Sequence, residues 1–141
     1  MLTLSAIDIL PLHDLPLHER LFKALDKLGF KQATAVQARA IPEALAGADL
    51  LVSAETGSGK TAAFLLPLLQ HLLVHKVGNT GTRALILLPT RELALQTQKQ
   101  FEQLAAFTYL KSGLIIGGEA FKHQVATLRK NPEVVIATPG R

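Results

Sequence analysis

Cysteine is absent from the 141-residue sequence, which excludes a disulfide framework and any zinc site built on cysteine ligands. Acidic residues are sparse too, and Asp49 is the last aspartate in the chain. The longest apolar helical stretch is interrupted by Gln70 and His71, well short of a membrane-spanning length. No basic residue precedes Arg20, which argues against a signal peptide. We therefore expect no membrane segment and a cytoplasmic location.

The residues that are present have the composition of a globular domain. Hydrophobic residues make up 48% of the chain and charged residues 18%, so the chain can bury a core. A net charge of +4 and a pI of about 9.6 mildly favour a polyanionic partner, although proteins that bind no nucleic acid often share these values. We find no internal repeat, and we expect a monomer.

The apolar pattern predicts an α/β fold with a mostly parallel sheet and helices on both faces. Short apolar runs predict buried strands at residues 50–53, 84–88, 113–116 and 134–137. Helical spacing predicts helices over 17–28, from Thr34 to an end or kink at Pro42, and over 60–75, 91–106 and 119–130. We expect residues 1–16 to be an extended lead-in and residues 76–82 to be a flexible loop.

Residues 54–61, with the sequence Ala-Glu-Thr-Gly-Ser-Gly-Lys-Thr, lie where a predicted strand turns into a helix. Gly57 and Gly59 leave room for backbone N–H groups to surround a polyphosphate at the start of that helix. Lys60 can reach the terminal phosphates, and the Thr61 hydroxyl can bind Mg²⁺. Such motifs also occur as ordinary loops, but the flanking strand and helix favour a phosphate-binding loop.

Three further loops follow predicted strands, where open α/β sheets bind ligands. Each of them has a structural interpretation: Thr90 could cap a helix, and the two glycine-containing loops could be simple turns. Together they favour contacts to successive phosphates of a nucleic acid, independent of base sequence. The loops are Pro89-Thr90-Arg91-Glu92, Gly117-Gly118 and Thr138-Pro139-Gly140-Arg141.

Gln37 has two interpretations that the residues alone leave open. It could complete a capping box with Thr34, or its carboxamide could hydrogen bond to adenine. His71 and His75 are one helical turn apart, but no third ligand accompanies them, so we interpret them as surface residues. The phenylalanines on apolar faces are expected in the core; they are Phe64, Phe101, Phe107 and Phe121.

Together these motifs resemble those of the DEAD-box ATP-dependent RNA helicases in order, spacing and residue identity. They are Gly29-Phe30 to Gln37, residues 54–61, Pro89-Thr90-Arg91-Glu92-Leu93-Ala94, Gly117-Gly118 and Thr138-Pro139-Gly140-Arg141. The resemblance covers residues 12–141 and implies that residues 17–141 are an incomplete RecA-like P-loop NTPase domain, the first of two.

The resemblance also implies roles for individual residues. Lys60 and Thr61 would be catalytic, with Thr61 holding Mg²⁺, and Gln37 would read adenine. The full set of residues that would bind ATP is Phe30, Gln37, Ala54, Thr56, Gly57, Ser58, Gly59, Lys60 and Thr61. The set that would bind an RNA backbone is Pro89, Thr90, Arg91, Gly117, Gly118, Thr138, Gly140 and Arg141.

The sequence departs from the family pattern in three places. Ala33 replaces a usual proline, and Leu12 stands where an aromatic residue generally stacks on adenine, so we expect weaker base stacking. No Asp-Glu-Ala-Asp motif occurs up to Arg141. We therefore expect these residues alone neither to hydrolyse ATP nor to unwind RNA. We also expect the segment before the phosphate loop to lack a strand partner, which would make the fragment marginally stable. The alternatives are a nucleotide- or RNA-binding module without catalysis and an unrelated phosphate-loop ATPase.

Overall fold

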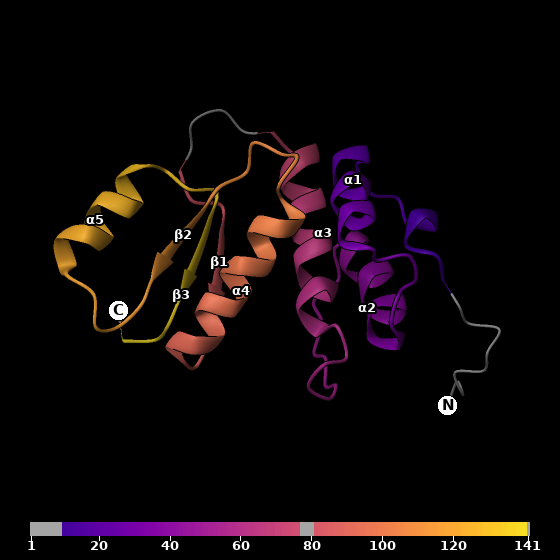
Figure 1. The fold of residues 1–141 in the computed structure, drawn as a ribbon, viewed down its shortest axis with the longest axis horizontal. Coiled ribbons are helices and arrows are strands. Elements are labelled where there is room, and N and C mark those ends of the chain that lie inside the picture. Colours follow the sequence, from indigo (N-terminus) through magenta and orange to yellow (C-terminus); the bar gives the residue numbers. More distant parts are fainter. Residues whose placement is uncertain (1–9, 77–80, 141) are drawn as a thin grey trace.

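The computed structural model describes residues 10–76 and 81–140. Helices α1, α2 and α3 form one side of the molecule, and the sheet with α4 and α5 forms the other (Figure 1). In the described part of the chain, no helix is long and apolar enough to cross a membrane. The elements are η1 (Leu12–Asp14), α1 (Glu19–Leu28), α2 (Ala35–Leu45), α3 (Lys60–Val74), β1 (Ala84–Leu87), α4 (Arg91–Leu104), β2 (Ser112–Ile115), α5 (Phe121–Arg129) and β3 (Val134–Ala137).

The three strands form a parallel sheet in the order β1-β3-β2. Helices α4 and α5 lie on opposite sides of this sheet (Figure 1). Side chains of β3 alternate between the two faces, as strand geometry requires. Val134 and Ile136 join the main core, whereas Val135 and Ala137 form a smaller cluster with Ile115. The predicted α/β fold with helices on both faces of a parallel sheet is confirmed.

Local sequence signals explain where the helices begin and end. Helix α1 ends at Gly29, whose φ of 75° suits a helix C-cap. Helix α2 begins with the capping box of Thr34 and Gln37, and Thr90 caps α4 by accepting from Leu93 N–H (3.2 Å). The observed helices and the three strands lie within about two residues of the predicted boundaries. The expected lead-in at residues 1–9 and most of the expected loop, at 77–80, lie outside the described residues.

Helix α2 continues through Pro42 to Leu45, so of the predicted end or kink at Pro42 the end does not occur. A proline removes one N–H donor, but its carbonyl can still accept a helical hydrogen bond. The Ala46 N–H donates to Pro42 O (3.1 Å), which continues the ladder past the proline. Helix α3 likewise contains Pro67 in its interior.

Residues 50–53 form no strand, contrary to the prediction. Leu51 is fully exposed at 103%, and its neighbours Leu50 and Val52 are more than two-fifths exposed. A strand needs a neighbouring backbone to satisfy its N–H and C=O groups, and none of the described strands pairs with this segment. The unpaired segment agrees with the expectation that the residues before the phosphate loop lack a partner in this chain.

Only one of the four phenylalanines predicted in the core lies there. Phe101 is 1% exposed, whereas Phe64 is 39%, Phe107 40% and Phe121 72% exposed. Helical spacing shows that residues share a face but does not show that another element covers it. In α5 the one buried residue is the polar Gln124, so the inner face of that helix is not its aromatic one.

Candidate functional site

The loop before α3 has the backbone geometry of an anion-binding turn. Gly57 and Gly59 have φ angles of 81° and 85°, which strain residues that carry a side chain by about 1–2 kcal/mol. The Ser58 N–H donates to Glu55 O (3.2 Å) and closes a turn. No side chain caps the start of α3, which follows Gly59 directly. The helix therefore presents N–H donors and the positive end of its dipole to a ligand.

Three side chains at this loop can contact a polyphosphate. Lys60 is exposed at the first position of α3, and Thr61 beside it is half-buried. The Ser58 hydroxyl is buried, and within the described residues it has no hydrogen-bond partner. An unsatisfied buried polar group costs about 1–3 kcal/mol, so an acceptor-rich ligand at this loop would relieve that cost. The group that fits is an anion with several oxygens.

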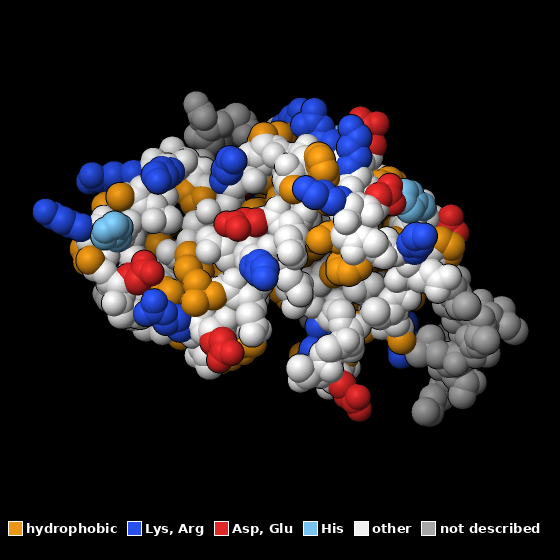
Figure 2. All heavy atoms as spheres, viewed as in Figure 1, with side chains coloured by type: hydrophobic (Ala, Val, Ile, Leu, Met, Phe, Trp, Pro, Cys, Tyr) orange, Lys and Arg blue, Asp and Glu red, His pale blue; other side chains and the backbone are white. Residues whose placement is uncertain are grey.

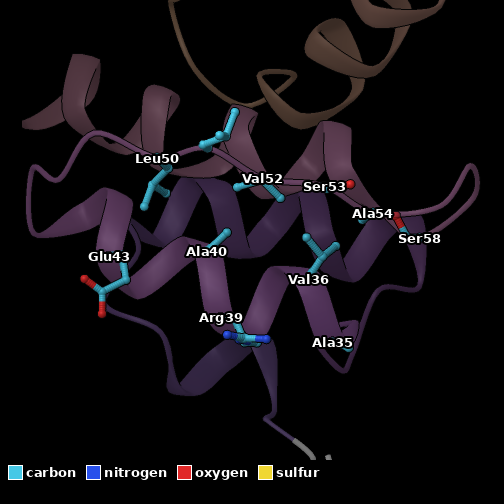
Figure 3. Close-up of a pocket in the computed structure, with 11 residues that line it drawn as sticks. Ala35, Val36, Arg39, Ala40, Glu43, Leu50, Val52, Ser53, Ala54 and Ser58 are labelled. Carbon is cyan, nitrogen blue, oxygen red and sulfur yellow. The ribbon is translucent and has the colours of Figure 1, made fainter. Parts of the chain in front are cut away.

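Two cavities border the phosphate loop. The first, of about 480 Å³, lies between α2 and residues 50–54 and reaches Ser58; Arg39 and Glu43 of α2 line it (Figure 3). The second, of about 660 Å³, is mainly apolar. Its lining residues include Lys60, Thr61, Phe64, Leu88 and Leu93. The second cavity thus extends from the phosphate loop to the start of α4.

Gln37 makes the capping box and also reaches the phosphate loop. Its Oε1 accepts from Thr34 N–H (3.0 Å), and its Nε2 donates to Gly59 O (3.2 Å). The side chain is 6% exposed. A Cβ at Gly59 would lie 2.5 Å from Gln37 Nε2, so this position accepts only glycine without movement. The capping box, one of the two interpretations of Gln37, is therefore present. Both ends of the carboxamide are hydrogen bonded within the protein.

The remaining residues expected at the nucleotide differ in their exposure. Leu12 is 1% exposed in the core, so its side chain is not open to a base in this structure. Phe30 is 46% exposed just beyond α1, where its N–H donates to Leu25 O (2.9 Å). Ala54 is half-buried and Thr56 is exposed in the phosphate loop itself.

The three loops predicted to contact RNA converge at the carboxyl ends of β1, β3 and β2. The Gly117 N–H donates to Thr138 Oγ1 (3.4 Å), which joins the loops after β2 and β3. A Cβ at Gly118 would lie 3.2 Å from Arg91 Nη1, so the guanidinium at the start of α4 lies against that glycine. These contacts bring a guanidinium, a hydroxyl and exposed backbone to one edge of the sheet.

The other predicted RNA contacts flank this cluster. Pro89 and Thr90 are exposed between β1 and α4, and the Thr90 hydroxyl serves as the cap of α4. Gly140 is exposed with a φ of 91°. Arg141 lies outside the described residues.

Sequence reasoning missed two contacts that hold these loops in place. One is the bond from Gln37 to Gly59, 22 residues apart in sequence. The other is Gln124, which is 5% exposed in α5 and donates from Nε2 to Ile116 O, next to Gly117. The sequence of α5 mixes polar and apolar residues, so no local signal marks Gln124 as its buried residue.

Comparison with known families and sequences gives a consistent match. The family model described as DEAD/DEAH box helicase matches residues 34–141. The probable ATP-dependent RNA helicase ddx27 of Dictyostelium discoideum is 59% identical over 128 residues, which are 91% of this chain and 16% of that protein. The ATP-dependent RNA helicase SrmB of Haemophilus influenzae is 50% identical over 126 residues, 89% of this chain and 29% of that protein. The chain thus spans less than a third of the length of these relatives.

Solved structures share the same fold. The crystal structure of a DEAD box protein from the hyperthermophile Methanococcus jannaschii matches with a TM-score of 0.84 and 38% identity. The match covers 93% of this chain and 35% of that one. The described chain is therefore an α/β domain of the RecA-like type, incomplete relative to that structure.

Proposed function

Because the chain belongs to the DEAD/DEAH box helicase family, we propose that it is the ATP-binding part of an ATP-dependent RNA helicase. It corresponds to the first portion of the first of two RecA-like domains, beginning near residue 17. In the full-length protein, ATP binding and hydrolysis would drive RNA clamping and local strand separation. The observation that carries the proposal is the phosphate loop, whose buried Ser58 hydroxyl, just before α3, has no hydrogen-bond partner among residues 10–76 and 81–140.

The nucleotide would be held by the donors of that loop. Backbone N–H groups from Gly57 to Thr61 and the Lys60 ammonium would contact the phosphates. The Thr61 hydroxyl would be an oxygen ligand of the Mg²⁺ that accompanies ATP, since Mg²⁺ prefers such ligands. Gln37 would read adenine only after exchanging its bond to Gly59 O for one to the base.

RNA would bind at the convergence of the loops that follow β1, β2 and β3. Arg91 offers a planar donor for a phosphate, and the exposed Gly117–Gly118 backbone permits close approach. Since these groups would contact the backbone and not base edges, binding would be sensitive to salt and tolerant of sequence.

The chain by itself is expected to bind but not to hydrolyse ATP. Phosphoryl transfer needs a carboxylate to organise Mg²⁺ and the attacking water, and these 141 residues contain no two adjacent acidic residues. Membership of the family removes the alternative of an unrelated phosphate-loop ATPase. A binding module without catalysis is the competing proposal, and turnover by the full-length protein distinguishes the two.

Replacing Lys60 tests the nucleotide site. In the full-length protein, Lys60→Ala should reduce ATP turnover by at least 100-fold, in the order of magnitude for a lost transition-state electrostatic contact. Lys23→Ala is the control, because Lys23 is an exposed lysine on α1. Steady-state phosphate release measures the ATP turnover of both variants. Equal turnover in Lys60→Ala and Lys23→Ala would refute the assigned role of Lys60.

A further inference from the structure

Phe121 is the most exposed aromatic side chain of the described residues, at 72%. Burying a phenylalanine side chain normally stabilises a protein, so a ring left this open retains apolar surface for a ligand. Single exposed apolar residues are ordinary on protein surfaces. The groups around Phe121 therefore decide whether its exposure has a function.

Those groups form a basic stripe along the outer face of α5. A shallow cavity of about 480 Å³ is lined by Phe121, Lys122, Val125, Ala126 and Arg129. The last four recur at helical spacing, so they share one face. Blue side chains project from the end of the molecule that α5 forms (Figure 2). From Gly117 to Lys130, Glu119 is the only acidic residue, so the stripe suits a polyanion.

This stripe continues directly from the proposed RNA-binding loops. Phe121 follows Gly118 by three residues, a span of at most roughly 10 Å. Gly118 in turn lies against Arg91. The buried Gln124 bonds to Ile116 O and so fixes α5 to the end of β2. The helix that carries Phe121 is therefore fixed beside the residues that would bind the RNA backbone.

We propose that the outer face of α5 is a further subsite for single-stranded RNA, in which Phe121 stacks on a base while Lys122 and Arg129 contact phosphates. The inference rests on the proposed function, since it concerns the same strand that Arg91, Gly118 and Thr138 would hold. Stacking on an aromatic ring accepts any base, so the subsite adds affinity without adding sequence preference. The α5 subsite would extend the proposed RNA site beyond the carboxyl ends of the strands.

Substitutions of Phe121 in the full-length protein test the stacking. Stacking of one base contributes about 1–3 kcal/mol, so Phe121→Ala should weaken binding of labelled oligouridylate by roughly 5- to 160-fold. Phe121→Leu keeps apolar bulk without a ring face and should weaken binding similarly, whereas Phe121→Trp should retain it. Phe107→Ala is the matched control: Phe107 is 40% exposed and its ring faces Lys27, 5.8 Å from the centroid.

The basic residues give an independent readout. Each phosphate contact to a single strand contributes about 0.7 to the slope of log K against log salt. The double variant Lys122→Ala, Arg129→Ala should therefore lower the magnitude of that slope by about 1.4. An unchanged slope would show that these two side chains contact no phosphate and would overturn their part of the proposal.

Arg91→Ala separates failure of this subsite from failure of the proposed function. If Arg91→Ala weakens RNA binding while Phe121→Ala and Phe121→Leu bind normally, the α5 subsite is wrong and the RNA-binding loops stand. If Phe121→Leu binds normally and only Phe121→Ala is weak, base stacking is wrong. If Arg91→Ala also binds normally, the proposed RNA site itself fails. Circular dichroism of each variant checks folding, and the comparison of Phe121→Leu with Phe121→Trp remains decisive if Phe121→Ala does not fold.

Discussion

Gln37 links the start of α2 to the phosphate loop through a single carboxamide. Its oxygen accepts from Thr34 N–H and its nitrogen donates to Gly59 O. The sequence left a capping role and an adenine contact open as separate interpretations. The structure shows the capping role together with the bond to Gly59 O, which neither interpretation includes. Contacts across 22 residues depend on tertiary packing, which a local motif does not encode.

Alanine substitutions at Gly57 and Gly59 distinguish the effect of backbone strain from the effect of displacing Gln37. Both have positive φ, so alanine strains either position, but only at Gly59 would a Cβ meet Gln37 Nε2, at 2.5 Å; nothing lies within 4 Å at Gly57. Gly59→Ala should therefore lower the free energy of unfolding by about 1–3 kcal/mol more than Gly57→Ala, from the displaced and unsatisfied carboxamide. Urea titration of the two variants in the full-length protein measures the difference. Equal destabilisation would show that Gln37 moves aside without cost.

Phe121 and Phe101 show why residue burial is predicted less well than helix position. Both lie on helices with apolar faces, but Phe101 is covered by the core while Phe121 is 72% exposed. The sequence pattern defines the face, whereas coverage depends on which other elements pack there. The pattern therefore predicts the helix but not the burial of each residue on it.

At the scale of elements, most helices and strands could be predicted because their signals are local. Gly29 ends α1, Thr34 and Thr90 cap α2 and α4, and the short apolar runs became β1, β2 and β3. The run at 50–53 failed because a strand depends on a partner, which lies outside its own sequence. Pro42 does not end α2, because the helix tolerates the loss of one donor and continues to Leu45.

Hydrogen exchange tests whether residues 50–53 join a sheet in the full-length protein. In residues 1–141 the amides of this unpaired segment should exchange rapidly, close to the rate of an unstructured chain. In the full-length protein we expect slower exchange by at least 100-fold, because strand pairing would protect these amides. The amides of β3, which pairs on both sides, serve as the protected reference. Rapid exchange in both proteins would refute a strand at 50–53.

At the scale of the whole molecule, the proposed nucleotide site and the proposed RNA site lie next to each other. Lys60 and Thr61 line the same cavity as Leu88 and Leu93, which bracket the loop carrying Arg91. Any coupling between the two proposed sites would therefore run through α3 and the start of α4. The exposed side chains of Leu85 and Leu87 on β1, with those of residues 50–52, support the expectation that residues 1–141 are marginally stable alone.

The coupling of ATP hydrolysis to RNA tests the central claim most directly. Phosphate release by the full-length protein should be measured against RNA concentration, for the unaltered protein and for Arg91→Ala. The account predicts that RNA raises the rate, and that Arg91→Ala needs at least 10-fold more RNA for half-maximal stimulation, in the range of a lost charge-assisted hydrogen bond. A hydrolysis rate that does not respond to RNA would contradict the account.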